Sequence, residues 1–425
     1  MADAKNESKP SQSQEPQKPQ QPKKPQEPQK PQVAWWKRLL LGMLSLLVAS
    51  AIWLPSVHLF FRPWSVPPKE GKISRLSEKL AARHLHLWTD PELLQGELDK
   101  MRAPNPEWDF MGRSFLVWSL ANICLREPDR KDEYLPVMDR IIDETIRIEQ
   151  EKGKYHFLMA YAQVCPFVMK PERSQFLDGE IALMMAMRRL VEEKESYREP
   201  LRQRVDVMVE RMETSPTMCA ESYPDECWLF CNTVALAAIR VSDHLDGTDH
   251  SDFFRRWIET AKAKLIDKDT GILVSSFTLR GTVIDGPEGS SIWLAAHCLK
   301  LIDEPFARQQ YRLAEKELAR GICGFGYARE WPPSRQGPCD IDSGPVIPVL
   351  EISAGSSGLA FVASRSFDDD AYFRSLLTTL ELAGFPYEKK GRLKYCASNQ
   401  VGDAVLLYST VLGPAWAKVQ GEKQP

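Results

Sequence analysis

The chain has 425 residues, with 55 Lys and Arg against 58 Asp and Glu and a formal net charge of -3 at pH 7. This length exceeds one average domain, although single toroidal or barrel domains reach it. The nearly balanced charge lacks the basic footprint that phosphate-backbone binding requires, so we expect no nucleic acid partner.

The first 32 residues consist mainly of Pro, Gln, Lys and Glu, with almost no apolar side chains. Such a segment cannot bury enough apolar surface to offset its chain entropy. We therefore predict a disordered tail over residues 1–32.

Residues 33–63 are strongly apolar, and residues 39–54 carry no charge. About 20 apolar residues suffice to cross the hydrocarbon core of a bilayer. Lys37 and Arg38 lie on the N-terminal flank, so the positive-inside tendency places the N-terminus in the cytoplasm. The pattern predicts a single-pass signal anchor that places the C-terminal domain outside the cytoplasm.

Two alternatives to the anchor stay open. The residues Ala49-Ser50-Ala51 have the small-x-small form of a cleavage site, which is typical of a removable signal peptide. A hydrophobic core helix would show similar apolarity, but the break at Pro55 and the preceding tail argue against it.

Between residues 70 and 419 the sequence repeats a pair of helical segments, the first mostly apolar and the second amphipathic. The pairs are 111–125 with 134–153, 178–193 with 197–213, 228–247 with 250–267, 290–303 with 305–321, and 343–367 with 369–384; 401–419 closes the chain, and 75–101 could pair with it. An apolar helix must be buried, whereas a charge-striped helix has one face in water. About six hairpins then predict an all-α (α/α)6 toroid, with an open helical solenoid as the alternative and residues 420–425 as a tail.

In such a toroid the loops before the inner helices line the mouth of the central cavity. These loops are rich in acids, aromatic residues, Gly and Pro, and they span 105–113, 220–228, 284–293, 328–345 and 395–403. Two carboxylates that face each other in a cavity shift each other's pKa values apart, so that one is protonated and the other ionised at neutral pH. Such a pair can act as a general acid and a general base. For any single acid the alternative is a carboxylate that stabilises a helix N-terminus.

The candidate catalytic acids are Asp109, Glu221, Asp225, Glu288 and Asp342. The candidate substrate-binding residues are Tyr223, Trp228, Asn232, Asp285, Trp293, Glu330, Trp331 and Asn399. Two further catalytic candidates are Cys231, near a helix N-terminus that would lower a thiol pKa, and His156, which precedes an apolar stretch. A buried cysteine that packs as a small hydrophobe is the alternative for Cys231.

No dinucleotide-binding, ATP-binding, serine-hydrolase or zincin motif is present. The nine cysteines include no CxxC pair, and Cys227 and Cys231 lack a clustered histidine partner. We therefore expect no cofactor and no metal. Sequence leaves the redox state of the cysteines open.

The block from about 105 to 419 resembles the linalool dehydratase/isomerase domain, whose motif runs Cys-Glu-Pro-Asp, five residues, Cys-Asn. Pro224-Asp225 and Cys231-Asn232 stand at the matching places, while Ser222 and Tyr223 replace the first cysteine and its acidic neighbour. The resemblance implies an (α/α)6 toroid that interconverts monoterpene alcohols and alkenes without a cofactor. It also implies a proton-handling role for Cys231 and, more loosely, for Asp109 and His156.

Three functions follow in order of preference. The first is a cofactor-independent lyase or isomerase that acts on a small, terpenoid-like alcohol or alkene, and the second is a carbohydrate-active hydrolase, lyase or epimerase. The third is a membrane-tethered binding module without catalysis. Homo-oligomers are possible in each case, and the fold alone does not choose among these functions.

Overall fold

The structure is a computed structural model that describes residues 35–335, 337–338 and 344–421. The predicted tail over residues 1–32 lies outside the described residues. The chain divides into two compact units, Met1–Trp53 and Leu54–Pro425.

Helix α1 (Trp35–Ser56) continues into the 3-10 helix η1 (Val57–Phe60). In the described part of the chain, Trp35–Phe60 is the one helical segment that is long and apolar enough to cross a membrane, with a mean hydropathy of 2.0. None of the residues of α1 is buried. A signal sequence would share these properties, so the membrane anchor stays a prediction.

Six inner helices form a closed ring. They are α4 (Pro106–Arg126), α6 (Gln175–Val191), α8 (Leu229–Asp246), α10 (Gly289–Leu299), α12 (Ala354–Ser366) and α14 (Gln400–Val411). Each inner helix packs against the next, and α14 packs against α4. This closure confirms the predicted all-α (α/α)6 toroid and shows that the open solenoid is wrong.

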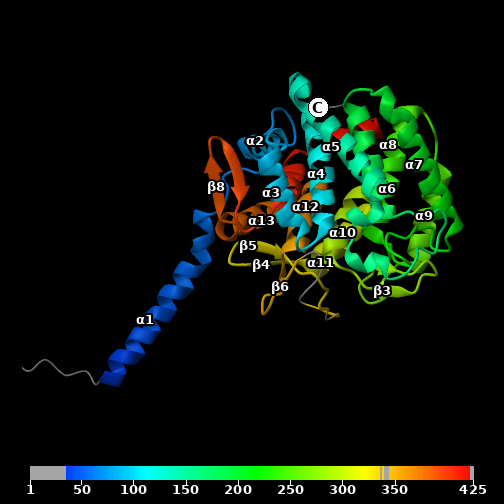
Figure 1. The fold of residues 1–425 in the computed structure, drawn as a ribbon. Helices are drawn as coiled ribbons and strands as arrows, with labels where there is room; N and C mark the ends of the chain where they lie inside the picture. Colours follow the sequence, from blue (N-terminus) through cyan, green and yellow to red (C-terminus); the bar gives the residue numbers. More distant parts are fainter. Residues whose placement is uncertain (1–34, 336, 339–343, 422–425) are drawn as a thin grey trace, which may run out of the picture. The chain divides into compact units, whose positions relative to one another are not determined.

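The outer layer is formed by helices that alternate with the inner ones in the chain. They are α5 (Lys131–Lys152), α7 (Glu195–Thr214), α9 (Ser251–Lys264), α11 (Glu304–Leu318), α13 (Asp370–Ala383) and, against α14, α2 (Arg75–Thr89). Figure 1 follows these helices around the ring in chain order. All residues of α6 are buried, whereas α7 buries only one face, as the apolar and amphipathic patterns predict.

Two predicted helices are interrupted. The segment 75–101 is divided into α2 and α3 (Pro91–Arg102) because Asp90 caps a new helix that starts with Pro91. The segment 401–419 is divided into α14 and α15 (Pro414–Gln420) by Leu412, whose ψ of 157° ends the first helix, and by Gly413, whose φ of 126° favours glycine.

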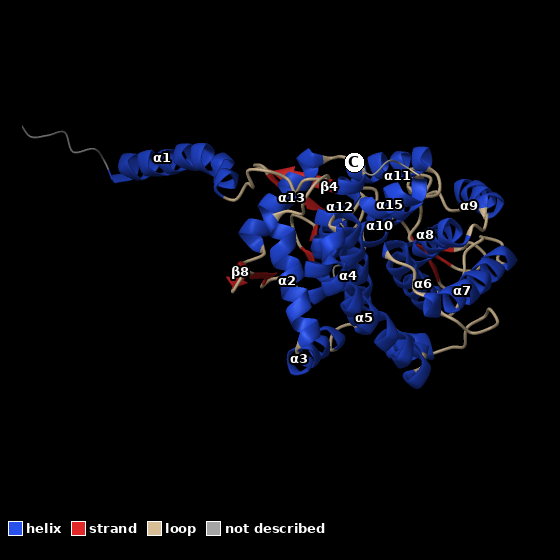
Figure 2. Ribbon diagram, turned by 90° about the horizontal axis from the view of Figure 1, so that it is seen from above, coloured by secondary structure: helices blue, strands red, loops and turns tan. Residues whose placement is uncertain are grey.

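Short strands occupy several of the loops, a feature that the helical periodicity does not predict. A three-stranded sheet has the order β1 (Cys227–Trp228), β2 (Ser276–Phe277), β3 (Val283–Asp285). The hairpins are β4 (Ala319–Ile322) with β5 (Phe325–Ala328), β6 (Val346–Ile347) with β7 (Ile352–Ser353), and β8 (Pro386–Lys389) with β9 (Arg392–Tyr395). Figure 2 shows how few and short the strands are among the helices. Part of the segment predicted as helix 343–367 is therefore the β6–β7 hairpin.

Further short elements connect the helices. They are the 3-10 helices η2 (Pro128–Arg130), η3 (Lys154–His156) and η4 (Ala160–Gln163). The last two lie in the long connection between α5 and α6, which also reaches the cavity through Tyr161.

Candidate active site

A cavity of about 980 Å³ lies at the N-terminal ends of the inner helices. Its walls carry many large apolar side chains, including Trp108, Met111, Phe176, Phe230, Phe361 and Leu406. These side chains come from four inner helices, α4, α6, α12 and α14, and from the start of α8. The cavity is therefore large enough for a small organic molecule and mainly apolar, as ligand sites commonly are.

The turn before α8 is fixed by Asn232. Its side-chain amide donates to the carbonyl of Ala220 (3.0 Å), and its oxygen accepts from the amide of the same residue (2.8 Å). Asn232 itself is fully buried and does not line the cavity. Because this clamp ties the turn to the first turn of α8, it brings Ser222 beside Cys231.

Cys231 lines the cavity and is almost fully buried. Burial raises the pKa of its thiol well above the usual range, and the carboxylates Glu107 and Glu180 raise it further, while the Ser222 hydroxyl lowers it. The lowered thiol pKa predicted from the helix N-terminus is therefore wrong, because loss of solvent outweighs the helix dipole. Cys231 is therefore a neutral thiol on the cavity wall.

Tyr223 joins three segments at the cavity wall. Its hydroxyl donates to Glu107 in the first turn of α4 and accepts from the amide of Met159 (3.0 Å). Its ring stacks on Tyr161 with ring centroids 4.5 Å apart. Tyr223, Tyr161 and Glu107 all line the cavity. The hydrogen-bonded pair of the Glu107 carboxylate and the Tyr223 hydroxyl therefore lines the same cavity as Cys231.

Glu180 lies on α6 and is fully buried. Neither of its carboxyl oxygens makes a regular hydrogen bond to a described residue. Burial raises its pKa to about 8, a shift that Ser114 reduces and Glu107 increases. At neutral pH the folded protein therefore holds Glu180 as a neutral acid, within electrostatic reach of Cys231.

Two of the predicted catalytic acids accept hydrogen bonds from backbone amides of the loops. The Glu221 carboxylate accepts from the backbone amides of Met169 (2.6 Å), Val168 (3.1 Å) and Asp225 (2.9 Å). Asp225 has a φ of 54° in an exposed turn, and its side chain accepts from the amide of Leu279. Neither Glu221 nor Asp225 lines the cavity, and we assign both a structural role.

Glu330 has a similar role between α10 and α12. Its carboxylate accepts from the hydroxyl and amide of Ser290 and from the hydroxyl of Ser353. Burial raises its pKa, and these donors reduce the shift. It does not line the cavity, so the structure places Glu330 as a brace between two inner helices.

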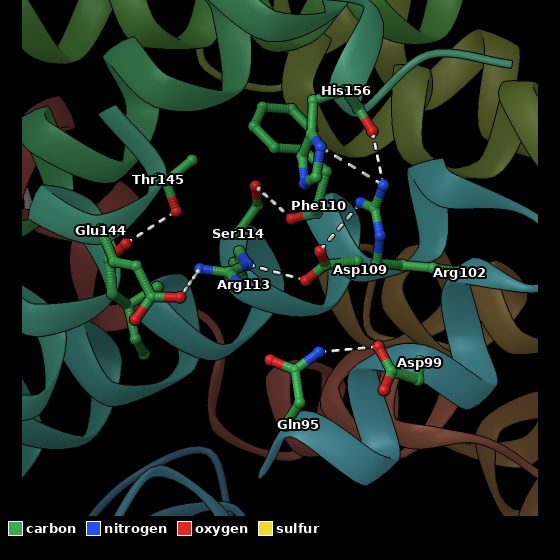
Figure 3. Close-up of polar contacts among 11 residues, drawn as sticks. Gln95, Asp99, Arg102, Asp109, Phe110, Arg113, Ser114, Glu144, Thr145 and His156 are labelled. Atoms are coloured by element: carbon green, nitrogen blue, oxygen red, sulfur yellow. Dashed lines mark hydrogen bonds and ion pairs between the residues drawn. The ribbon is translucent and has the colours of Figure 1, made fainter. Parts of the chain in front are cut away.

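Asp109 and His156 lie close together, but outside the cavity. Asp109 forms ion pairs with Arg113 (2.7 Å) and Arg102 (3.2 Å), and Arg113 also pairs with Glu144 (Figure 3). Arg102 in turn donates to the carbonyl of His156 (2.9 Å). Burial and the neighbouring Arg102 lower the His156 pKa to about 4. This cluster ties α4 to its neighbours and does not face the cavity.

The ion-pair cluster carries a prediction for stability. We expect Asp109→Asn to lower the free energy of unfolding by about 3 kcal/mol, because it leaves the buried Arg113 with one of its two partners. Chemical denaturation monitored by circular dichroism measures this change. Glu199→Gln, in an exposed pair on α7, is the control and should leave stability unchanged. If the Asp109→Asn variant lost its activity but kept the stability of the wild type, the structural role assigned to Asp109 would be contradicted.

The remaining predicted residues divide between the cavity rim and the core. Five of them line the cavity, namely Trp228, Asp285, Glu288, Trp331 and Asn399. Trp293 is buried between inner and outer helices, where its indole donates to Ser356 (3.0 Å). Asp342 lies outside the described residues. No cluster of three or more metal-binding side chains occurs among the residues that the structure describes.

A family model described as linalool dehydratase/isomerase matches residues 174–400, which is more than half of the chain. The chain belongs to the linalool dehydratase/isomerase family. No curated protein matches the sequence.

Solved structures with similar folds include two enzymes. A GH76 α-mannanase of Bacteroides thetaiotaomicron is 10% identical, with 73% of this chain and 87% of that chain covered and a TM-score of 0.47. An unsaturated glucuronyl hydrolase of Bacillus sp. GL1 is 12% identical, with 70% and 84% covered and a TM-score of 0.47.

The family match covers the whole turn that positions Cys231. In the motif to which this chain is similar, a second cysteine stands where this member of the linalool dehydratase/isomerase family has Ser222. The Ser222 hydroxyl is buried, lies beside the Cys231 thiol and has no other regular hydrogen-bond partner among the described residues. A hydroxyl thus takes the place of the second thiol.

Sequence reasoning missed three acids. Glu107 stands two positions before Asp109, which was predicted instead, and both lie in the first turn of α4, where acids commonly stabilise the helix dipole. Glu180 could have been recognised as an acid within the buried inner helix 178–193. Asp403 lines the cavity, and burial raises its pKa to about 7. No local pattern distinguished it from the helix-start acids.

Eight cysteines of the described chain are free thiols, and five of them are buried. His297, on α10, is a buried core histidine. It is stacked on Trp416 and hydrogen-bonded to Ser366 and Tyr408. His297 is part of the core packing of this linalool dehydratase/isomerase family member and does not line the cavity.

Proposed function

We propose that this protein is a membrane-anchored, cofactor-independent lyase or isomerase of the linalool dehydratase/isomerase family. It adds water to a small, apolar alkene, removes water from a small, apolar alcohol, or shifts a double bond in such a molecule. The observation that carries the proposal is the convergence of Glu107, Tyr223 and Cys231 on one apolar cavity, with the neutral acid Glu180 behind Cys231.

Dehydration needs one group that protonates the leaving hydroxyl and another that removes a proton from the adjacent carbon. We assign the first role to the Cys231 thiol and the second to the Glu107 carboxylate, which Tyr223 orients through its hydroxyl. The carbon–oxygen bond breaks, water leaves and a double bond forms. The thiolate is then reprotonated by Glu180, and the proton that Glu107 took up passes to the Glu180 carboxylate, so that all three groups return to their starting states.

Glu180 is suited to the reprotonation step. It is neutral at pH 7 because of burial, and it lies near Cys231, where a thiolate would otherwise be stranded in an apolar environment. It does not line the cavity, so it acts through Cys231 and not on the substrate. The reverse sequence of proton transfers gives hydration. Proton donation and removal by the same groups, without loss of water, give isomerisation.

A second candidate function is a carbohydrate-active enzyme. One observation favours it: the rim carries the carboxylates Asp285 and Glu288 together with the half-buried indole of Trp331, a combination that suits sugar rings. The apolar side chains below the rim are less suited to a hydroxyl-rich substrate.

Two parallel assays test the proposed function. The purified full chain in detergent is incubated with a set of small tertiary and allylic alcohols, and alkene products are measured by gas chromatography. The same preparation is incubated with oligosaccharides and chromogenic glycosides. We expect alkene or isomerised alcohol and no sugar release. Sugar release without alkene formation would overturn the proposal.

A further inference from the structure

The chain that follows the apolar segment is docked on the β4–β5 hairpin. The His58 and Phe61 rings both lie against Phe325 of β5, each with ring centroids 6.4 Å apart. A side chain at Gly324, in the hairpin turn, would overlap the His58 ring. These residues all belong to the compact unit Leu54–Pro425, so the point where the apolar segment ends is fixed on this hairpin.

The same hairpin forms part of the cavity wall. Gly326 and Tyr327 of β5 line the cavity. The Tyr327 carbonyl accepts from the Tyr372 hydroxyl of α13 (2.8 Å), which holds β5 against the toroid. One short hairpin therefore contacts the end of the apolar segment on one side and the cavity on the other.

Large apolar side chains are exposed along this edge of the toroid. Val349, at the turn between β6 and β7, is 96% exposed, and Ile347 and Ile322 are about half exposed. Val283 and Ile284 of β3 are also exposed. In Figure 1, β3, β4 and β6 lie along the same lower edge of the toroid. Exposed apolar patches of this kind mark interaction surfaces.

Aromatic side chains at the start of the unit extend the apolar edge. Phe60 is 81% exposed and Trp64 is fully exposed, within a few residues of the docked His58. Tryptophan is favoured at membrane–water interfaces because its ring is apolar and its N–H is polar. By contrast, the opposite ends of the inner helices lead into polar turns such as Pro128–Arg130.

We propose that this edge of the toroid rests on a lipid bilayer, with the β6–β7 turn and the Ile322 side chain in the interface. The cavity then opens toward the membrane and receives an apolar alcohol or alkene that is dissolved in the bilayer. This inference rests on the proposed anchor and deepens the proposed function. The apolar wall of the cavity and the apolar edge form one path for such a substrate.

Membrane affinity of the substrate gives this arrangement a physical advantage. Each methylene group of a lipophilic molecule favours its partition into lipid, so a terpenoid-sized alcohol is concentrated in the bilayer. A cavity that opened only to water would receive little of it. The docking of His58 and Phe61 places the end of the apolar segment against β5, whose residues Gly326 and Tyr327 line the cavity.

The test uses the full chain in lipid nanodiscs. Cys165, Cys323 and Cys396, which are exposed, and Cys339, which lies outside the described residues, are replaced by Ser. Single cysteines are then introduced by Val349→Cys at the β6–β7 turn, Asp129→Cys in the exposed η2 turn and Leu46→Cys in α1. Each is labelled with an environment-sensitive fluorophore, and quenching by spin-labelled phospholipid is measured.

We expect several-fold stronger quenching at position 349 than at position 129, and strong quenching at position 46. Equal quenching at 349 and 129, with 46 quenched, would overturn the inference and leave the anchor intact. Absence of quenching at 46 would overturn both. Cross-linking between copies through position 349 would show that a second copy covers this edge. The experiment requires no turnover, so failure of the proposed function is detected separately.

Discussion

Glu180→Gln is expected to abolish most of the turnover. The stability of the variant relative to the wild type should also be higher at neutral pH than at acidic pH. Activity should fall by about 100-fold or more, because the variant cannot return a proton to Cys231. The wild-type rate should also change with pH near 8, where Glu180 ionises, and the variant should lack this dependence.

The stability effect follows from the raised pKa. An unfolded chain ionises Glu180 near its ordinary value of 4.5, whereas the folded protein holds the proton until about pH 8. Between these values the unfolded state binds fewer protons, so rising pH favours unfolding. Glutamine is neutral in both states. The stability of the variant relative to wild type should therefore rise by on the order of 3 kcal/mol from pH 4 to pH 7.

Urea denaturation at pH 4, 5.5 and 7 measures this difference, and a direct activity assay measures the loss. Glu315→Gln is the matched control, because burial also raises the pKa of Glu315, but this residue lies on the outer helix α11 away from the cavity. It should keep its activity. A fully active Glu180→Gln variant would remove Glu180 from the proposed reaction, even if the stability change were found.

Cys231→Ser is expected to lower turnover by about 100-fold to 10,000-fold, because the serine hydroxyl is a much weaker acid than a thiol. The substitution is nearly isosteric and should leave the fold intact. Steady-state kinetics on an active alcohol substrate measures the loss, which should appear in kcat more than in KM, since a proton donor acts mainly in the transition state.

Two controls sharpen this result. Cys124→Ser alters another buried thiol, on the far half of α4 and outside the cavity wall, and should be nearly silent. Glu288→Gln changes a rim carboxylate and should also keep most of the activity. A silent Cys231→Ser together with an inactive Glu288→Gln would instead support the carbohydrate-active alternative.

The architecture could be predicted from the sequence because its signal is distributed over long helices. The apolar segment 178–193 and the striped segment 197–213 alternate as inner and outer helices must, and burial of α6 and α7 follows that pattern. The β6–β7 hairpin was missed because two strands of two residues each have no periodicity to read.

The site could be predicted only in part. The motif located Cys231, and the loop composition located Tyr223, Trp228 and Glu288 near one cavity. Sequence could not show that the Glu221 carboxylate accepts from three backbone amides, because two of the donors, Val168 and Met169, lie on a different loop. The thiol pKa was predicted in the wrong direction because the degree of burial depends on side chains that are distant in the chain.

We have proposed that Glu107, Tyr223 and Cys231 act together on one apolar guest. A crystal structure of the protein with a bound, unreactive analogue of its alcohol substrate is the decisive experiment. We expect the analogue to lie among these three residues, with its oxygen within hydrogen-bonding distance of the Cys231 sulfur. An analogue bound only at the rim, between Asp285 and Glu288 and away from Cys231, would contradict the proposal.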